Sequence, residues 1–137
     1  MAVWIGDNVS IAGLSPALEL ADLEFPPLDA EAILAANVYQ RHVVLGPRRP
    51  VCPVDQVEAH AFHGDKESRT DDVETLTGAL AALVAHVDAT LVAAGERLAE
   101  GEVVIAGSVV PPLAVSPGDR VRYVLRPLGE VSISFDG

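Results

Sequence analysis

The sequence predicts an α+β protein with about six or seven short strands, one long helix and one short helix. Two patterns carry this prediction. Apolar residues recur at steps of three and four from Val73 to Leu91, which is the period of one helix face. After Asp119, two segments alternate apolar and polar residues, as half-buried strands do. A chain of 137 residues can bury a core without disulfides, so we expect residues 1–137 to form a single domain.

The N-terminal third contains strand, helix and turn signals in succession. Residues 17–22 alternate with period two, which predicts a strand. Asp29 can cap a short helix over residues 30–36, because aspartate is a favoured N-cap residue. The run 38–45 is rich in strand-forming residues and stops at Gly46-Pro47, a turn signal.

The middle of the chain contains the predicted long helix. Residues 55–62 alternate loosely, which indicates another strand, and the polar stretch 63–72 is expected to be a loop or exposed turn. The long helix follows, with Asp71 or Asp72 as its N-cap and Gly95 at its C-terminal end.

The last forty residues are expected to be β structure. Residues 102–106 form an apolar run, and residues 116–119 (Ser-Pro-Gly-Asp) form a turn. The alternating segments 120–125 and 130–136 are expected to be antiparallel neighbours.

The composition disfavours several classes of partner. The formal net charge is −11, with 20 acidic against 9 basic residues and a single lysine, Lys66, so we expect no nucleic acid and no anionic membrane as partner. The N-terminus lacks the basic start of a signal peptide, and no apolar run reaches the ~18 residues of a membrane span. We therefore expect a cytoplasmic protein.

Three other groups of residues were considered as sites. Cys52 is the only cysteine and is expected to be an inert loop residue. His60 and His63 precede two acidic residues, but a separation of three on a strand puts them on opposite faces, which argues against a shared metal. The arginines of the predicted strand 120–125 and its end share one face, where they could bind a carboxylate or form salt bridges: Arg120, Arg122 and Arg126.

Four stretches resemble, in the right order, a known enzyme family. Residues 15–19 (Ser-Pro-Ala-Leu-Glu) resemble a strand of the 2-hydroxypentadienoate hydratases and oxalocrotonate decarboxylases, a branch of the fumarylacetoacetate hydrolase superfamily. Asn37 with residues 43–46 resembles the next segment of that family, and residues 101–108 (Gly-Glu-Val-Val-Ile-Ala-Gly-Ser) resemble a later strand. Residues 116–119, and then residues 128–135, resemble its closing hairpin. The resemblance implies a mixed β-roll packed by helices, often oligomeric.

The resemblance also implies a chemistry and a set of site residues. The family adds water to a 2-hydroxydienoate or removes carbon dioxide from a related 2-oxo acid, and Mg²⁺ or Mn²⁺ acts as a Lewis acid. Glu19 matches one of its metal-binding carboxylates and is the candidate acid/base. Ser108, Gly107 and Asn37 match positions at the substrate, a small carboxylic acid.

The resemblance covers only the C-terminal half of family members. The half that supplies a Glu-x-Glu pair of ligands and a lysine has no counterpart here, so we expect an incomplete metal site. Glu19 would hold a metal only if a partner supplied further ligands. Simpler interpretations remain open: a solvent-facing strand carboxylate for Glu19, a turn-capping serine for Ser108 and a helix C-cap for Asn37.

These observations lead to a hydratase/decarboxylase-like lyase acting on a small 2-oxo or 2-hydroxydienoic acid or a related enolisable substrate. Three alternatives remain: a metal-free isomerase or cyclase on the same fold, a subunit completed by a partner chain, and a non-catalytic binding or oligomerisation module. A homo-oligomer or a complementary N-terminal-half subunit is the expected assembly.

Overall fold

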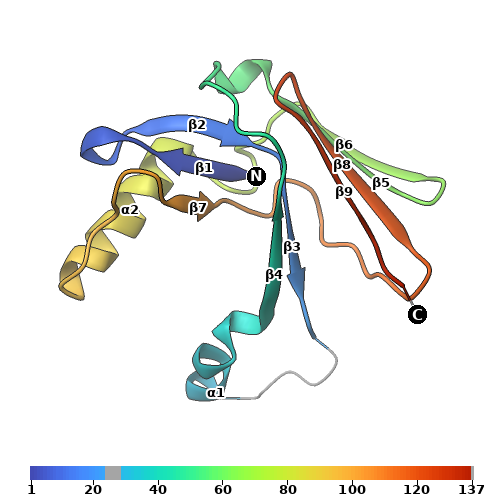
Figure 1. Ribbon diagram of the computed structural model, residues 1–137, viewed down its shortest axis with the longest axis horizontal. Helices are drawn as coiled ribbons and strands as arrows, with labels where there is room; N and C mark the ends of the chain where they lie inside the picture. Colours follow the sequence, from blue (N-terminus) through green and yellow to red (C-terminus); the bar gives the residue numbers. More distant parts are fainter. Residues whose placement is uncertain (24–28, 137) are drawn as a thin grey trace.

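The computed structural model describes residues 1–23 and 29–136, and within them it is an α+β protein with three antiparallel sheets and two α-helices (Figure 1). The strands are β1 (Ala2–Ile5), β2 (Ile11–Ser15), β3 (Ala17–Ala21), β4 (Gln40–Leu45), β5 (Glu58–His63), β6 (Lys66–Thr70), β7 (Val103–Ile105), β8 (Arg120–Arg126) and β9 (Gly129–Ser134). The helices are α1 (Ala30–Ala35) and α2 (Leu80–Ala93), with short 3-10 turns at Asp7–Val9, Asn37–Tyr39 and Val54–Gln56.

The first sheet has the order β2-β1-β7, and its central strand lies in the core. Val3 and Ile5 of β1 are fully buried, and Leu14 of β2 is nearly so. Leu80 and Val84 of α2 belong to the same core cluster, which places the apolar side of α2 against this sheet (Figure 1). Burial of this apolar surface is the main force that holds the N-terminal strands and the long helix together.

The second sheet is a two-stranded ribbon of β3 and β4. Together with α1 and the turn Asn37–Tyr39 it forms a projection that we call the arm (Figure 1). Asp29 caps α1, because its Oδ1 accepts a hydrogen bond from the Ala32 N–H at 2.8 Å. The base of the arm packs tightly on the body: a Cβ added to Gly46 would lie 2.6 Å from Pro16 Cγ and 3.0 Å from the Glu130 carbonyl oxygen.

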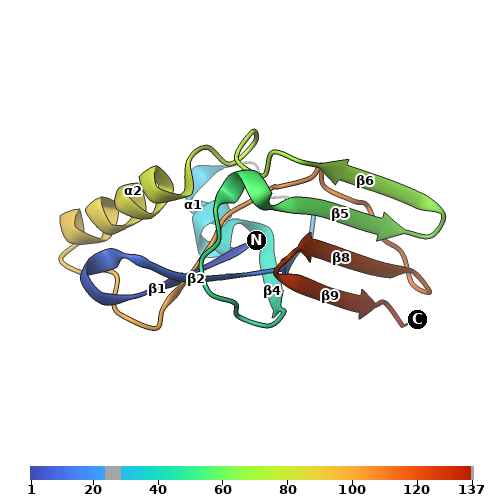
Figure 2. The same cartoon turned by 90° about the horizontal axis from the view of Figure 1, so that it is seen from above.

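The third sheet has the order β6-β5-β8-β9, and its two faces differ. Ala59, Ala61, Tyr123 and Leu125 point into the core, whereas their sequence neighbours on β5 and β8 are partly or fully exposed. Figure 2 shows the four strands side by side. The predicted antiparallel pairing of the last two strands is confirmed, with Tyr123 opposite Val131.

Several sequence predictions are confirmed and others are corrected. The predicted α+β class, the strand at 17–22 and the capped short helix are all present. The predicted number of strands, six or seven, is too low, because the sequence patterns do not predict β1 and β2. The stretch 63–72 is not a loop: Lys66–Thr70 forms β6, joined to β5 by a turn at Gly64, whose φ is +56°. The expected mixed β-roll remains a prediction.

The long helix begins later than predicted. Gly78 adopts a left-handed conformation with φ +72°, so the chain cannot continue as one helix from Val73. Asp72 accepts a hydrogen bond from the Glu74 N–H in the preceding turn, and the helix N-terminus is instead bonded by the Glu74 side chain. The predicted end at Gly95 is confirmed, with φ +86°.

No helix in the described part of the chain is long and apolar enough to cross a membrane.

Candidate functional site

Glu19 lies in the middle of β3, at the base half of the arm. It is exposed and stands directly opposite Val43 of β4. Because opposite residues of an antiparallel pair share a face, Val43 and Leu45 lie on the Glu19 side of the ribbon. Leu18 and Val44 lie on the other side and pack against the core. The carboxylate therefore extends from an anchored strand into a partly apolar open surface.

The amino group of Met1 connects Glu19 to the segment after β7. It donates a hydrogen bond to the Ala106 carbonyl oxygen at 3.0 Å. Burial lowers the pKa of this amino group to about 6, and the nearby negative charge of Glu19 acts in the opposite direction. Ala106 therefore bonds this amino group directly, and Glu19 acts on it only through its charge.

Gly107 and Ser108 follow Ala106, and both are exposed. A Cβ added to Gly107 would meet no atom within 4 Å, so the backbone here faces open space. Glu19, Gly107 and Ser108 are thus all exposed, and their grouping in one binding site stays a prediction.

Asn37 lies elsewhere, near the far end of the arm. It follows α1 in a left-handed conformation with φ 53°, and its side-chain amide donates to Gln40 Oε1. Gln40 pairs with Ala21, two residues beyond Glu19 on β3. This position fits the helix C-terminal interpretation of Asn37, and its role as a substrate contact stays a prediction.

The described residues contain no cluster of three or more His, Cys, Asp or Glu side chains that could hold a metal ion. Glu19 alone cannot hold a divalent ion tightly, because Mg²⁺ and Mn²⁺ require several oxygen ligands. His60 and His63 point to opposite faces of β5: His60 Nδ1 lies 2.6 Å from Glu67 Oε1, and His63 Nε2 lies 2.9 Å from Asp119 Oδ2. The described residues alone thus do not fit a complete metal site.

Two hollows of the described surface lie away from Glu19 and Ser108. One of about 180 Å³ is lined by Glu58, His60, Arg69, Thr70 and Asp71. The other, of about 310 Å³, is lined by Gly6, Asp7, Asn8, Val9, Arg97, Leu98 and Glu100.

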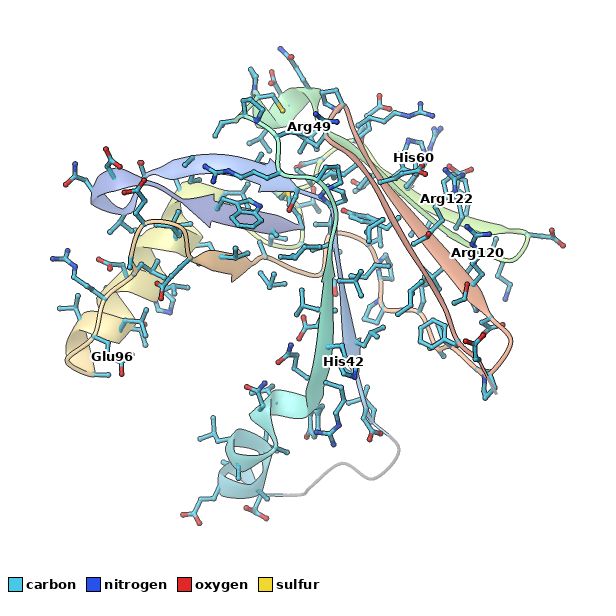
Figure 3. All side chains as sticks on the ribbon, in the orientation of Figure 1. His42, Arg49, His60, Glu96, Arg120 and Arg122 are labelled. Atoms are coloured by element: carbon cyan, nitrogen blue, oxygen red, sulfur yellow. The ribbon has the colours of Figure 1, made fainter. Side chains whose placement is uncertain are left out.

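The three arginines of β8 do share one face, as the sequence predicts, with the buried residues between them pointing inward. Arg120 and Arg122 lie on the four-stranded sheet with His60 (Figure 3). Sequence reasoning missed that Phe62 of β5 faces Arg122 of β8, since that pairing depends on strand register. In the sequence, the only signal for this contact is the loose alternation of apolar residues along residues 55–62.

Comparisons with known proteins identify the fold. No protein-family model matches the chain, and no curated protein sequence does. Two solved structures of 4-oxalocrotonate decarboxylase from Pseudomonas putida G7 match 98% of this chain at 18% identity. One is complexed with calcium and acetate (TM-score 0.79), and the other with magnesium and adipate (TM-score 0.82). The chain spans 57% of the length of each. The match confirms, at the level of fold, the resemblance found in the sequence.

Proposed function

We propose that this chain is a hydratase/decarboxylase-type lyase that acts on a small 2-oxo or 2-hydroxydienoic acid. The observation that carries the proposal is the fold, because two 4-oxalocrotonate decarboxylase structures, each complexed with a divalent metal and a carboxylate, match 98% of this chain. Glu19 on β3 gives further support, because its negative charge acts on the Met1 amino group, which also bonds Ala106.

Glu19 is proposed to move the proton. Both reactions place negative charge on an enolate, and a carboxylate beside the substrate carbon can remove or return its proton. Anchoring of β3 through Leu18 keeps the carboxylate in place. Val43 and Leu45 flank it and offer an apolar contact for the substrate chain.

Ser108 is proposed to bind the substrate carboxylate or the enolate oxygen. Its hydroxyl and the exposed backbone of Gly107 can donate hydrogen bonds to an anionic oxygen. Such donors stabilise the charge that develops when the proton leaves.

The described residues do not complete a metal site, so no step of the reaction is assigned to a metal ion. If a divalent ion takes part, Glu19 would supply one ligand, and the 2-oxo-carboxylate of the substrate would supply two more. A Lewis acid at that position would withdraw charge from the enolate.

Calorimetric titration tests this arrangement. We expect neither Mg²⁺ nor Mn²⁺ to bind the chain alone, and either to bind when oxalate is present as a mimic of the 2-oxo-carboxylate. Glu19→Gln should abolish the oxalate-dependent binding, and Glu96→Gln, in an exposed loop far along the chain, should preserve it. No binding in either condition would exclude metal-dependent catalysis by this chain alone.

A second candidate is a subunit completed by a partner chain. It is favoured by the fact that this chain spans 57% of each matched decarboxylase. In that case metal binding and turnover would appear only after a second chain with a Glu-x-Glu strand is added.

A metal-free isomerase or cyclase would instead give an isomerised product in the presence of a chelator.

A further inference from the structure

The four-stranded sheet has a surface that the lyase proposal does not use. We define the outer face as the side chains of this sheet that point away from the core. Strand register and alternating burial identify them as Glu58, His60, Phe62, Glu67, Arg69, Arg120, Arg122, Val124, Arg126, Glu130, Ser132 and Ser134.

The outer face is unusual in its charge. It holds four of the nine Lys and Arg residues of the chain, but only three of the 20 carboxylates. Those three carboxylates are engaged: Glu58 and Glu67 lie beside His60, and Glu130 bonds Arg122. The rest of the chain therefore carries a large negative excess, and the outer face does not.

A rigid stack occupies the centre of the outer face. The Arg122 guanidinium carbon lies 4.2 Å from the centre of the Phe62 ring. The His60 ring is stacked with the same Phe62 ring, with ring centres 6.2 Å apart and planes within 8°. Arginine and aromatic side chains are enriched at protein interfaces, and groups that are already fixed lose little entropy on docking.

The arm carries the complementary properties. The six-residue helix α1 buries none of its residues, and a helix this short is not stable in water without packing. Leu34 and Val38 are 70% and 58% exposed. Asp29 and Glu31 give the same end of the arm two negative charges. The arm is therefore an apolar, acidic element without a covering surface among the described residues.

We propose that α1 of one copy docks on the outer face of a second copy, and that the reciprocal contact closes a two-fold dimer. Leu34 would cover Phe62 and Val124, while Glu31 would lie beside Arg120 or Arg126, which stand at opposite ends of β8. Within one chain the arm projects away from the sheet, so α1 cannot reach its own outer face (Figures 1 and 3). A two-fold axis repeats the contact once and closes the assembly.

The second copy is the preferred occupant because the chain itself carries both complementary surfaces. A partner protein of any other kind would have to reproduce the acidic and apolar character already present on the arm. The inference does not depend on the lyase proposal, since oligomeric state is measured without substrate.

Charge reversal on each surface gives a sharp test by sedimentation equilibrium at low ionic strength. The face-reversed variant is Arg120→Glu/Arg126→Glu, and the arm-reversed variant is Glu31→Arg/Ala35→Arg. Each variant alone should self-associate at least about tenfold more weakly than the wild type, because both contacts become repulsive. An equimolar mixture of the two should form the dimer again, because opposite charges then meet at both contacts.

Controls separate a specific interface from a general charge effect. Lys66→Glu/Arg97→Glu makes the same change in net charge as the face-reversed variant, but outside both surfaces, and should remain dimeric. Circular dichroism of each variant establishes that it is folded. A monomeric wild type at tens of micromolar protein, or a variant mixture that stays monomeric, would overturn the proposal.

Discussion

At the scale of single residues, Tyr123 departs most clearly from the rule that buried polar groups form hydrogen bonds. Its side chain is 3% exposed, and its hydroxyl has no hydrogen-bond partner among the described residues. Burial raises the pKa of this phenol above its ordinary value. A buried hydroxyl that loses its water without gaining a partner destabilises the folded state.

We therefore expect Tyr123→Phe to stabilise the protein, by about 1 kcal/mol, because the ring stays and the unpaired hydroxyl is removed. Urea unfolding measures this change as a higher midpoint at constant slope. Tyr39→Phe, at a partly exposed position on the arm, is the control and should change little. A loss of stability in Tyr123→Phe would mean that the hydroxyl does have a partner.

Asp119 shows how a turn residue can tie two strands together. The Ser116 N–H and the His63 imidazole both hold its carboxylate, at 2.8 and 2.9 Å, and lower its pKa below the ordinary 3.8. Because the folded-state pKa is lower than the unfolded one, this contribution to stability is present above pH 3.8 and lost as pH falls through the folded value.

Thermal unfolding as a function of pH tests the role of Asp119. Asp119→Asn should melt at a lower temperature than the wild type near neutral pH, and the two should converge well below pH 3.8. Asp136→Asn, close to the C-terminus and exposed, should not show this convergence. A difference that persists unchanged at low pH would assign the effect to packing and not to charge.

The Asp29 cap could be predicted from sequence, whereas the contact of Asp119 with His63 could not. A cap is local, because Asp29 bonds a backbone group three residues away. His63 meets Asp119 only because β5 pairs with β8, and nothing in the spacing of the two residues fixes that pairing. Glu19 was identified by motif, but its relation to Ala106 required the structure.

At the scale of elements, the alternation of apolar and polar residues predicts a strand correctly where exactly one side of that strand is buried. Burial alternates along β8, and that alternation is visible in the sequence. It does not exist in β1, where three of four residues are buried, so the strand was missed. The edge strand β6 was missed for the opposite reason, because none of its residues is buried.

The start of α2 gives a test at the same scale. The Glu74 Oε1 atom accepts a hydrogen bond from the Leu80 N–H at 2.7 Å and so satisfies a donor at the helix N-terminus. Glu74→Ala should lower the free energy of unfolding by about 1 kcal/mol, as the loss of a helix cap does. Measured in the same urea series, Glu100→Ala, an exposed loop change, should be close to neutral, and an equal loss in both would refute the capping role.

At the scale of the whole molecule, the fold could be predicted from the sequence, but the arrangement of its elements in space could not. The ordered stretches at 15–19 and 101–108 pointed to a fold that the solved decarboxylase structures share. Isolated motifs do not say that β3 and β4 leave the body as an arm, or that Asn37 lies near its far end. A substrate contact of Asn37 therefore stays a prediction.

The central claim is that Glu19 transfers a proton to and from an enolisable 2-oxo acid. The most direct measurement is the exchange of C3 protons of 2-oxobutanoate in deuterium oxide, followed by proton NMR with and without Mg²⁺. We predict exchange above the buffer rate with the wild type, a loss of at least about 100-fold of that excess with Glu19→Gln, and a smaller loss with Ser108→Ala. Exchange no faster than buffer, or unchanged in Glu19→Gln, would contradict the proposed site and favour a non-catalytic module.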